Sequence, residues 1–421
     1  MSDSSLRWLS ATEILARKPD PAAVVDSHLD AIDRFNPRLR AFVHVDHGAR
    51  STTGVTFAVK DSQPVAGMPY TYGTATWRDR IAPEDAVPVA RARAAGMAVL
   101  GKTNVPELAA SIGTANALFG ATQNPWRDGV TPGGSSGGSG AAVAAGLCTV
   151  ALGGDTGGSI RIPASCCGVV GLRPTPDRVF SEEVDTTVLQ SRGPMTRTVA
   201  DARYLFSVMT STAPDGAAPK RRALVGVAYG DAEQACQEAC RRAAGALEKA
   251  GHEVEEIPWD PRPVCDGYGV VRRASMASYP IDLSTFGPGI QKLAAEGRSL
   301  SAMDYFHAFE SATHAANRCV AIPLQTRYDF LLTPTLGMLP MAIEKVPAFL
   351  GDEWAKYVQF VLPVSFARNP AVSVPAGLQD GLPVGVQLVG QFAREYELLD
   401  FAEELEKMPG FGFQRPPGVD A

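Results

Sequence analysis

The chain has 421 residues, of which 45% are hydrophobic and 20% are charged, the proportions of an ordinary globular protein. Its formal net charge of −6 gives no electrostatic reason to expect nucleic acid or an anionic membrane as a partner. The seven cysteines follow no disulfide framework, the first residues carry no secretion signal and no apolar stretch is long enough to span a bilayer, so we expect buried free thiols and a cytoplasmic location.

Helical signals dominate the beginning of the chain. Ser10 and Glu13 have the spacing of a capping box, and Pro21 begins a segment whose apolar residues recur at helical spacing. The sequence therefore predicts helices within residues 1–36, followed by a strand over residues 39–45.

Strand and helix signals then alternate along the rest of the chain. Strands are predicted at residues 55–61, 97–104, 147–156, 222–229, 252–259, 328–335, 371–377 and 383–390. Helices are predicted at residues 88–96, 135–146, 231–250, 288–296, 303–320 and 396–408. This alternation predicts an α/β fold, and the lack of a repeat or long linker favours a single domain over residues 1–421.

Two glycine- and serine-rich segments carry the strongest chemical signal. They read TPGGSSGGSG around Ser135 and Ser136, and GGDTGGSIRIP around Ser159. Glycine lets the backbone pass close to a reacting carbonyl and turn its N–H groups toward it, as an oxyanion hole requires. The core-like flanks argue against a flexible linker, and the missing GKS or GKT argues against a phosphate loop. Consecutive N–H donors are expected at Thr156, Gly157, Gly158 and Ser159.

Two lysines are candidate bases. Lys60 ends an apolar strand, where it is either an ordinary solvated lysine or a buried amine whose lowered pKa lets it accept a proton. Lys102 lies in a similar apolar segment, and spacing alone does not separate the two. The six histidines are scattered, and no GxSxG or HExxH motif is present, so neither a Ser–His–Asp triad nor a metal site is predicted.

Taken together, these segments resemble the amidase signature family. The match begins near residue 55, is densest over residues 98–175 and continues through RGPMTRTVADA and NPAVSVPAGLQDGLPVGVQLVG to about residue 405. The resemblance implies an α/β fold with a single large mixed β-sheet sandwiched by helices. It divides the chain into an N-terminal helical region (1–54), a signature core (55–205) and a remainder (206–421) that completes the sheet and the substrate pocket.

The resemblance also implies a Ser–cis-Ser–Lys triad that needs no cofactor and no metal. Ser159 matches the nucleophile, and Ser135 matches a bridging serine that follows a cis peptide bond. Lys60 matches the base, which favours it over Lys102. The oxyanion-hole segment of the family is matched by Thr156, Gly157, Gly158 and Ser159. Residues expected to brace the triad through hydrogen bonds are Ser136, Asp155 and Arg161.

The substrate pocket is less defined than the triad. The small residues Ala109, Ala110 and Ser111 match a stretch that lines the site in relatives and would leave room there. Arg368 is a candidate partner for a substrate carboxylate, with a surface ion pair as the alternative. Candidates for an aromatic wall, each with ordinary core packing as the alternative, are Tyr268, Tyr279, Phe286, Tyr305, Phe306 and Phe309.

The resemblance favours a stand-alone amidohydrolase that cleaves the C–N bond of a small primary or aryl amide and releases ammonia or an amine. The alternative is a glutamine-hydrolysing component similar to the A subunit of a tRNA-dependent amidotransferase. A silent relative that only binds a small molecule is disfavoured because all three triad residues are present. The expected partners are a small-molecule amide and, as is common among relatives, a second copy of the chain.

Overall fold

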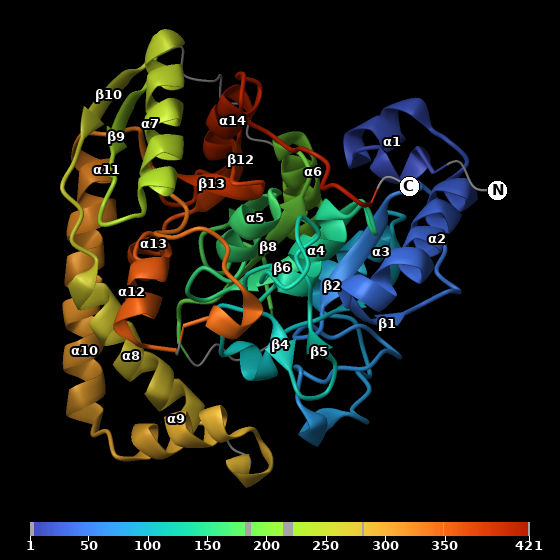
Figure 1. The fold of residues 1–421 in the computed structure, drawn as a ribbon, viewed down its shortest axis with the longest axis horizontal. Coiled ribbons are helices and arrows are strands. Elements are labelled where there is room, and N and C mark those ends of the chain that lie inside the picture. The colour runs from blue at the N-terminus through green and yellow to red at the C-terminus, as the bar shows by residue number, and fades with distance from the viewer. Residues whose placement is uncertain (1–3, 182–186, 214–221, 280–281, 348, 420–421) are drawn as a thin grey trace.

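The structure, a computed structural model, describes residues 4–181, 187–213, 222–279, 282–347 and 349–419. A mixed sheet of eleven strands runs through these residues (Figure 1). In order across the sheet, the strands are β1 (Phe42–Val45), β3 (Ala98–Thr103), β2 (Thr56–Lys60), β6 (Val150–Asp155), β8 (Ser191–Thr196), β7 (Val170–Arg173), β12 (Ala371–Gln379), β13 (Leu382–Val389), β11 (Phe330–Pro334), β9 (Leu224–Val227) and β10 (Glu253–Glu256). The predicted α/β fold with one large mixed sheet is confirmed.

All three predicted segments contribute strands to this sheet. Residues 1–54 supply β1, residues 55–205 supply the strands from β2 to β8, and residues 206–421 supply the others, while β4 (Ala115–Asn116) and β5 (Gly120–Ala121) form a separate two-stranded sheet. A sheet shared in this way supports the expectation of a single domain.

Helices cover the sheet (Figure 1). They are α1 (Ala11–Arg17), α2 (Pro21–Leu39), α3 (Val87–Ala94), α4 (Gly137–Ala144), α5 (Arg161–Cys167), α6 (Val199–Thr210), α7 (Gln234–Lys249), α8 (Arg262–Ala277), α9 (Pro288–Arg298), α10 (Ala302–Ala316), α11 (Ile322–Thr326), α12 (Asp352–Val358), α13 (Val361–Ala367) and α14 (Glu395–Glu406).

The two faces of the sheet have separate apolar cores. On β2, Phe57 and Val59 pack in a cluster with residues of α1, α3, α6, α7 and α14. Ala58 packs in a second cluster with residues of α2, α4 and α5. Side chains alternate along a strand, so Lys60 at the end of β2 lies on the same face as Ala58. The strand thereby directs this lysine toward the layer that contains α4 and α5.

The N-terminal predictions are confirmed except at one boundary. Both hydrogen bonds of the capping box are present between Ser10 and Glu13, and α2 begins at Pro21. Residues 1–3 of the predicted helical region lie outside the described residues. The strand predicted over residues 39–45 is wrong at its start, because α2 continues to Leu39 and β1 begins only at Phe42.

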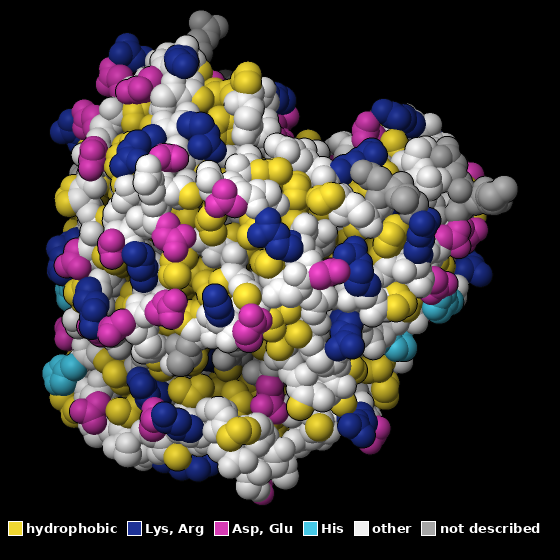
Figure 2. Space-filling model, viewed as in Figure 1, with side chains coloured by type: hydrophobic (Ala, Val, Ile, Leu, Met, Phe, Trp, Pro, Cys, Tyr) yellow, Lys and Arg dark blue, Asp and Glu magenta, His cyan; other side chains and the backbone are white. Residues whose placement is uncertain are grey.

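The later part of the chain contains the βαβ unit that was predicted. β9 and β10 are parallel and are connected through α7. Residues 260–350 also contain α8, which sequence periodicity did not reveal; it packs against α9 and α10 at the lower left of Figure 1. On the face drawn in Figure 2, lysine and arginine side chains are interspersed with aspartate and glutamate, and neither sign gathers into one large patch.

Candidate active site

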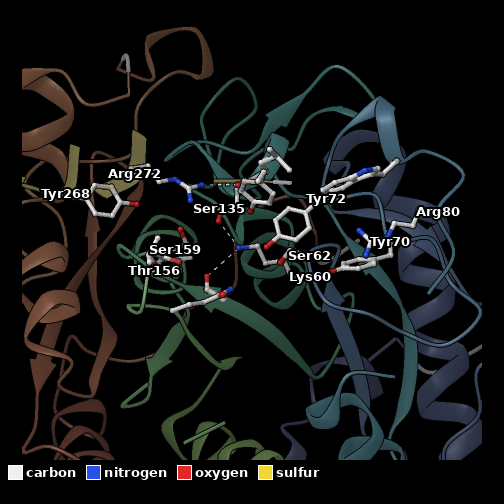
Figure 3. Close-up of a pocket in the computed structure, with 17 residues that line it drawn as sticks. Lys60, Ser62, Tyr70, Tyr72, Arg80, Ser135, Thr156, Ser159, Tyr268 and Arg272 are labelled. Carbon is white, nitrogen blue, oxygen red and sulfur yellow. Dashed lines mark hydrogen bonds between the residues drawn. The ribbon is translucent and has the colours of Figure 1, made fainter. Parts of the chain in front are cut away.

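Lys60 is placed by two parallel strands that end side by side. β2 and β6 pair in parallel, and Lys60 is the last residue of β2. The side chain is buried, with 2% exposure. Its Nζ is hydrogen-bonded to Ser135 Oγ at 2.7 Å and donates to the carbonyl oxygen of Gly154 at 3.4 Å (Figure 3). The sheet thus brings an amine directly against a hydroxyl.

Ser135 lies two residues before α4, a helix of small residues whose N-cap is Ser136. The Gly134–Ser135 peptide bond is cis, as the resemblance implied. The small residues let α4 lie directly on neighbouring backbone, since a Cβ on Gly138 would lie only 2.7 Å from the carbonyl oxygen of Ala41. The glycines therefore let α4 pack closely against its neighbours, and this packing brings Ser135 to Lys60.

Ser159 approaches the same place from the start of α5. The Ser136 N–H donates to the Ser159 carbonyl at 3.1 Å, so the two serine segments are joined through their backbones. Gly158 has φ +107°, and a Cβ there would lie 2.6 Å from Val361 Cγ2, so the turn requires glycine. This turn presents Ser159 to the cavity that Lys60 and Ser135 also line.

One of the four expected oxyanion donors has another partner. The Gly158 N–H donates to Asp155 Oδ1 at 2.7 Å and is therefore already engaged within the turn. The same carboxylate also accepts from the Ile160 N–H at 3.2 Å, so it holds the turn through two backbone N–H groups. The remaining candidates in the segment are the N–H groups of Thr156, Gly157 and Ser159.

Asp155 anchors the turn through two buried arginines. Arg161 donates to it from Nε at 2.9 Å and from Nη2 at 3.0 Å, and Arg173 donates from Nη1 at 3.1 Å. Burial by itself would raise the pKa of Asp155, but the two guanidinium groups hold it well below its usual range. The carboxylate therefore stays charged and fixes the turn that holds Ser159.

Ser136 takes a similar bracing position on the other segment. Its hydroxyl donates to the carbonyl oxygen of Gly154 and accepts from the N–H of the same residue, both at 3.3 Å. These bonds tie the start of α4 to the end of β6. The structure thus brings together all three residues that were expected to brace the triad.

The environment of Lys60 favours the neutral amine. Burial lowers the pKa of Lys60 to about 7; the charge of Asp155 opposes this shift, and those of Arg272 and Arg192 add to it. Within the described residues, no carboxylate lies within ion-pair distance of Nζ. Close to neutral pH, a large fraction of Lys60 can therefore accept a proton.

Lys102, the rival lysine, has a different environment. It is fully buried, donates to Asp61 Oδ1 at 3.1 Å and to the carbonyl oxygen of Pro69 at 2.9 Å, and lies 5.4 Å from the centre of the Tyr70 ring. A carboxylate partner favours the charged form of a buried lysine, and that form has no lone pair with which to accept a proton. The structure separates the two lysines that spacing alone left open.

A cavity of about 280 Å³ is lined by the candidate catalytic residues. Lys60, Ser135, Thr156 and Ser159 lie at its centre in Figure 3, between side chains from residues 70–80 on one side and from α8 on the other. Sequence reasoning missed most of these walls, which include Tyr70, Tyr72, Trp77, Arg80, Gln190 and Arg272. The aromatic-rich stretch YTYGTATW was the available signal for the first wall.

Only one of the three small residues expected in the pocket lines this cavity. Ala109 does so, next to Leu108. Ala110 and Ser111 line a separate depression bordered by Arg273 and α9. The short turn at Leu108 and Ala109, both with positive φ, directs the following residues away from the reactive serines.

The aromatic candidates also divide. Tyr268 and Tyr279 line the cavity. The other four do not: Phe286 packs with Leu108 in a small core, Tyr305 and Phe309 pack in the core around α8, and Phe306 is 58% exposed. The side chain of Arg368 is 44% exposed and pairs with Asp177 at 3.2 Å, the surface ion pair that was the alternative for this residue.

No histidine lines the cavity, and His28, the most deeply buried of the six, lies elsewhere, with burial lowering its pKa to about 3. Among the described residues, no group of three or more His, Cys, Asp or Glu side chains is placed to hold a metal ion. No helix formed by the described residues has both the length and the apolar character needed to cross a bilayer.

Comparisons with known proteins identify the family of this chain. Residues 24–399 match the family model described as Amidase. The chain is 30% identical to an acylamidase from Rhodococcus erythropolis, over 99% of this chain and 98% of that protein. It is 32% identical to the A subunit of a glutamyl-tRNA(Gln) amidotransferase from a Nitratiruptor species, over 94% of this chain and 99% of that one.

Among solved structures, that of a 6-aminohexanoate cyclic dimer hydrolase is similar, with a TM-score of 0.88 and 27% identity over 98% of this chain and 99% of that one. The chain therefore belongs to the amidase signature family and is an amidase-family hydrolase.

Proposed function

We propose that this protein hydrolyses the C–N bond of a small carboxylic amide through an acyl-enzyme on Ser159. The observation that carries the proposal is the 2.7 Å hydrogen bond between Lys60 Nζ and Ser135 Oγ, at the edge of a cavity that Ser159 also lines. A lysine whose pKa is about 7 supplies a neutral amine at the pH where the enzyme would work.

In acylation, neutral Lys60 takes the proton of Ser135 as Ser135 takes the proton of Ser159. The Ser159 oxygen forms a bond to the amide carbon, and the carbonyl oxygen becomes an oxyanion. N–H groups of Thr156, Gly157 and Ser159 are the candidate donors for this oxyanion. The proton then returns from Lys60 through Ser135 to the amide nitrogen, the C–N bond breaks, and ammonia or an amine leaves.

Deacylation repeats the relay with water as the nucleophile. Water loses a proton through Ser135 to Lys60 while its oxygen bonds to the acyl carbon. The bond to Ser159 then breaks, the serine regains a proton, and a carboxylic acid is released. Each cycle therefore consumes one water and returns all three side chains to their starting state.

The walls of the cavity support a small substrate with an apolar or aryl part. Tyr70, Tyr72, Trp77 and Tyr268 offer aromatic surface, and a volume of about 280 Å³ suits a compact molecule. Every group in the proposed relay comes from this one chain, which supports a stand-alone hydrolase.

The second candidate is a glutamine-hydrolysing component that supplies ammonia to a partner. It is favoured by the 32% identity to the A subunit of an amidotransferase, which is similar to the identity with the acylamidase. Glutaminase activity measured on the isolated chain, with and without a co-purified partner, distinguishes the two. A stand-alone amidase hydrolyses simple amides alone, whereas the second candidate needs its partner for full turnover.

We further infer a single-domain cytoplasmic protein that pairs with a second copy of itself. All seven cysteines are buried and unpaired, which supports a reducing compartment. Light scattering of the purified chain tests the pairing, and a monomer at micromolar concentration would contradict it.

The central test is ammonia release from a panel of short aliphatic, aryl and amino-acid amides. Ser159→Ala is expected to abolish turnover, and a fluorophosphonate probe is expected to label the parent at Ser159 by mass spectrometry. Ser165→Ala is the matched control, because Ser165 is a buried serine of α5 whose hydroxyl accepts from the Gly385 N–H outside the cavity. Full turnover by Ser159→Ala would refute the nucleophile.

A further inference from the structure

Arg272 enters the cavity from α8. It lies one helical turn after Tyr268, so both side chains project from the same face of the helix, and both line the cavity. The residue is only 7% exposed. In Figure 3 its side chain extends from the α8 side toward Ser135. A guanidinium group is therefore held in the same cavity as Ser135 and Ser159.

The hydrogen bonding of Arg272 is incomplete. Nη2 donates to the carbonyl oxygen of Leu108 at 3.0 Å, which fixes the direction of the group. Nε is buried and has no hydrogen-bond partner among the described residues. In the same part of the chain, no carboxylate lies within ion-pair distance of this arginine. A buried, permanently charged group without a counter-charge is destabilising unless something else neutralises it.

No charged residue that the structure describes around Arg272 is free to neutralise it, which leaves neutralisation to a ligand. None of the described residues that line the cavity is acidic, and a second arginine, Arg80, lies across the cavity against the ring of Tyr70 at 4.1 Å. The nearby carboxylate of Asp155 is already bound by Arg161 and Arg173. The cavity thus presents positive charge around a neutral amine, an environment that attracts an anion.

We propose that Arg272 binds a carboxylate of the substrate, so that this enzyme acts on small amides that carry a free carboxylate group. Among anions, a carboxylate matches the planar guanidinium, whose terminal nitrogens can donate to its two oxygens. The inference rests on the proposed function for its reaction, but the anion site itself does not depend on turnover.

The test compares two substrates of nearly equal size: glutaramate, the monoamide of glutaric acid, and the uncharged diamide glutaramide. The parent is expected to prefer glutaramate at least about tenfold in kcat/KM. Arg272→Gln is expected to lose about 10- to 100-fold on glutaramate, mainly through KM, because a charge-assisted pair is removed. On glutaramide it is expected to lose less than about threefold.

The measurements are made at pH 9, where Lys60 is neutral in both the parent and the Arg272→Gln variant. A change in the charge of Lys60 therefore does not contribute to the difference in kcat/KM. Arg273→Gln is the matched control: it is the next residue of α8, but it pairs with Glu296 at 2.6 Å and lies outside the cavity. It is expected to keep the preference of the parent. Should Arg272→Gln fail to fold, Arg272→Lys replaces it, with an intermediate loss expected because the charge stays and the planar fork is removed.

Binding of glutarate to the Ser159→Ala protein, measured by calorimetry, separates this inference from the proposed function. Binding that weakens at least about tenfold on adding Arg272→Gln supports the carboxylate site even if no amide is hydrolysed. An equal loss of kcat/KM on both substrates, or glutarate binding that is unchanged by Arg272→Gln, overturns the carboxylate site. In that case hydrolysis of glutaramide would still support amidase chemistry.

Discussion

Two buried lysines on adjacent strands show how the same residue type acquires opposite environments. β2 and β3 are parallel, and Lys102 is paired with Val59, whereas Lys60 is paired with Thr103. Neighbours in register share a face, so the two lysines project to opposite faces of the sheet. On its face Lys102 meets the carboxylate of Asp61; on the other, Lys60 meets the hydroxyl of Ser135.

The comparison shows that two buried lysines can differ in whether a counter-charge is present. Both side chains are removed from water, which disfavours the charged amine. At Lys102 the carboxylate of Asp61 compensates for the loss of hydration. The amine of Lys60 contacts a hydroxyl and a carbonyl oxygen instead of a carboxylate. The chemical role follows from the counter-charge, and the register of two strands decides which lysine receives one.

The largest expected effect is that of Lys60→Met on catalysis. Loss of the proton acceptor is expected to lower kcat/KM about 1,000-fold at pH 7, while circular dichroism and thermal unfolding stay those of a folded protein. Fold is retained because no partner charge is left unpaired. Substantial activity in this variant would mean that another group accepts the proton.

Lys102→Met is expected to act on stability instead. Its removal leaves Asp61 buried without a counter-charge, so the free energy of unfolding should fall by about 3–5 kcal/mol, measured as a lower urea midpoint. Adding Asp61→Asn should restore part of the loss by removing the stranded charge. A protein that loses activity but keeps its urea midpoint would contradict the structural role.

The pH profile sharpens the contrast further. The active form of Lys60 is the deprotonated one, so kcat/KM should fall about tenfold per pH unit below a midpoint near 7 and level off above it. Arg272→Gln should move this midpoint upward, because the positive charge of Arg272 helps to lower the pKa of Lys60. A midpoint near that of free lysine would show that Lys60 is solvated in the working enzyme.

The smallest effect is expected for Arg368→Gln. Its ion pair with Asp177 is exposed, so the free energy of unfolding should change by less than about 0.5 kcal/mol. The kcat/KM for carboxylate-bearing amides should stay within about twofold of the parent, in contrast to Arg272→Gln. A large loss on glutaramate would place Arg368 at the substrate.

Much of the reactive centre was predictable because its signals are local. Glycine-serine segments around Ser135 and Ser159 and the apolar strand ending at Lys60 carry the resemblance to the family. The capping box at Ser10 was predictable from a spacing of three residues, and the βαβ unit from the periodicity within each of its elements. Local geometry and local sequence agree there, so the sequence is sufficient.

The amino-acid sequence by itself determined the α/β class, the family and the identities of the candidate nucleophile, bridge and base. Only the tertiary structure decided which side chains wall the cavity: it brought in Arg272 and Tyr72, and turned Ala110 and Ser111 away. It also decided that the Gly158 N–H donates to the carboxylate of Asp155. The place of Arg272 in the cavity depends on how α8 packs against α9 and α10, and the separation of Lys60 from Lys102 depends on the register of β2 with β3. These are contacts between separate elements, which no stretch of local sequence encodes.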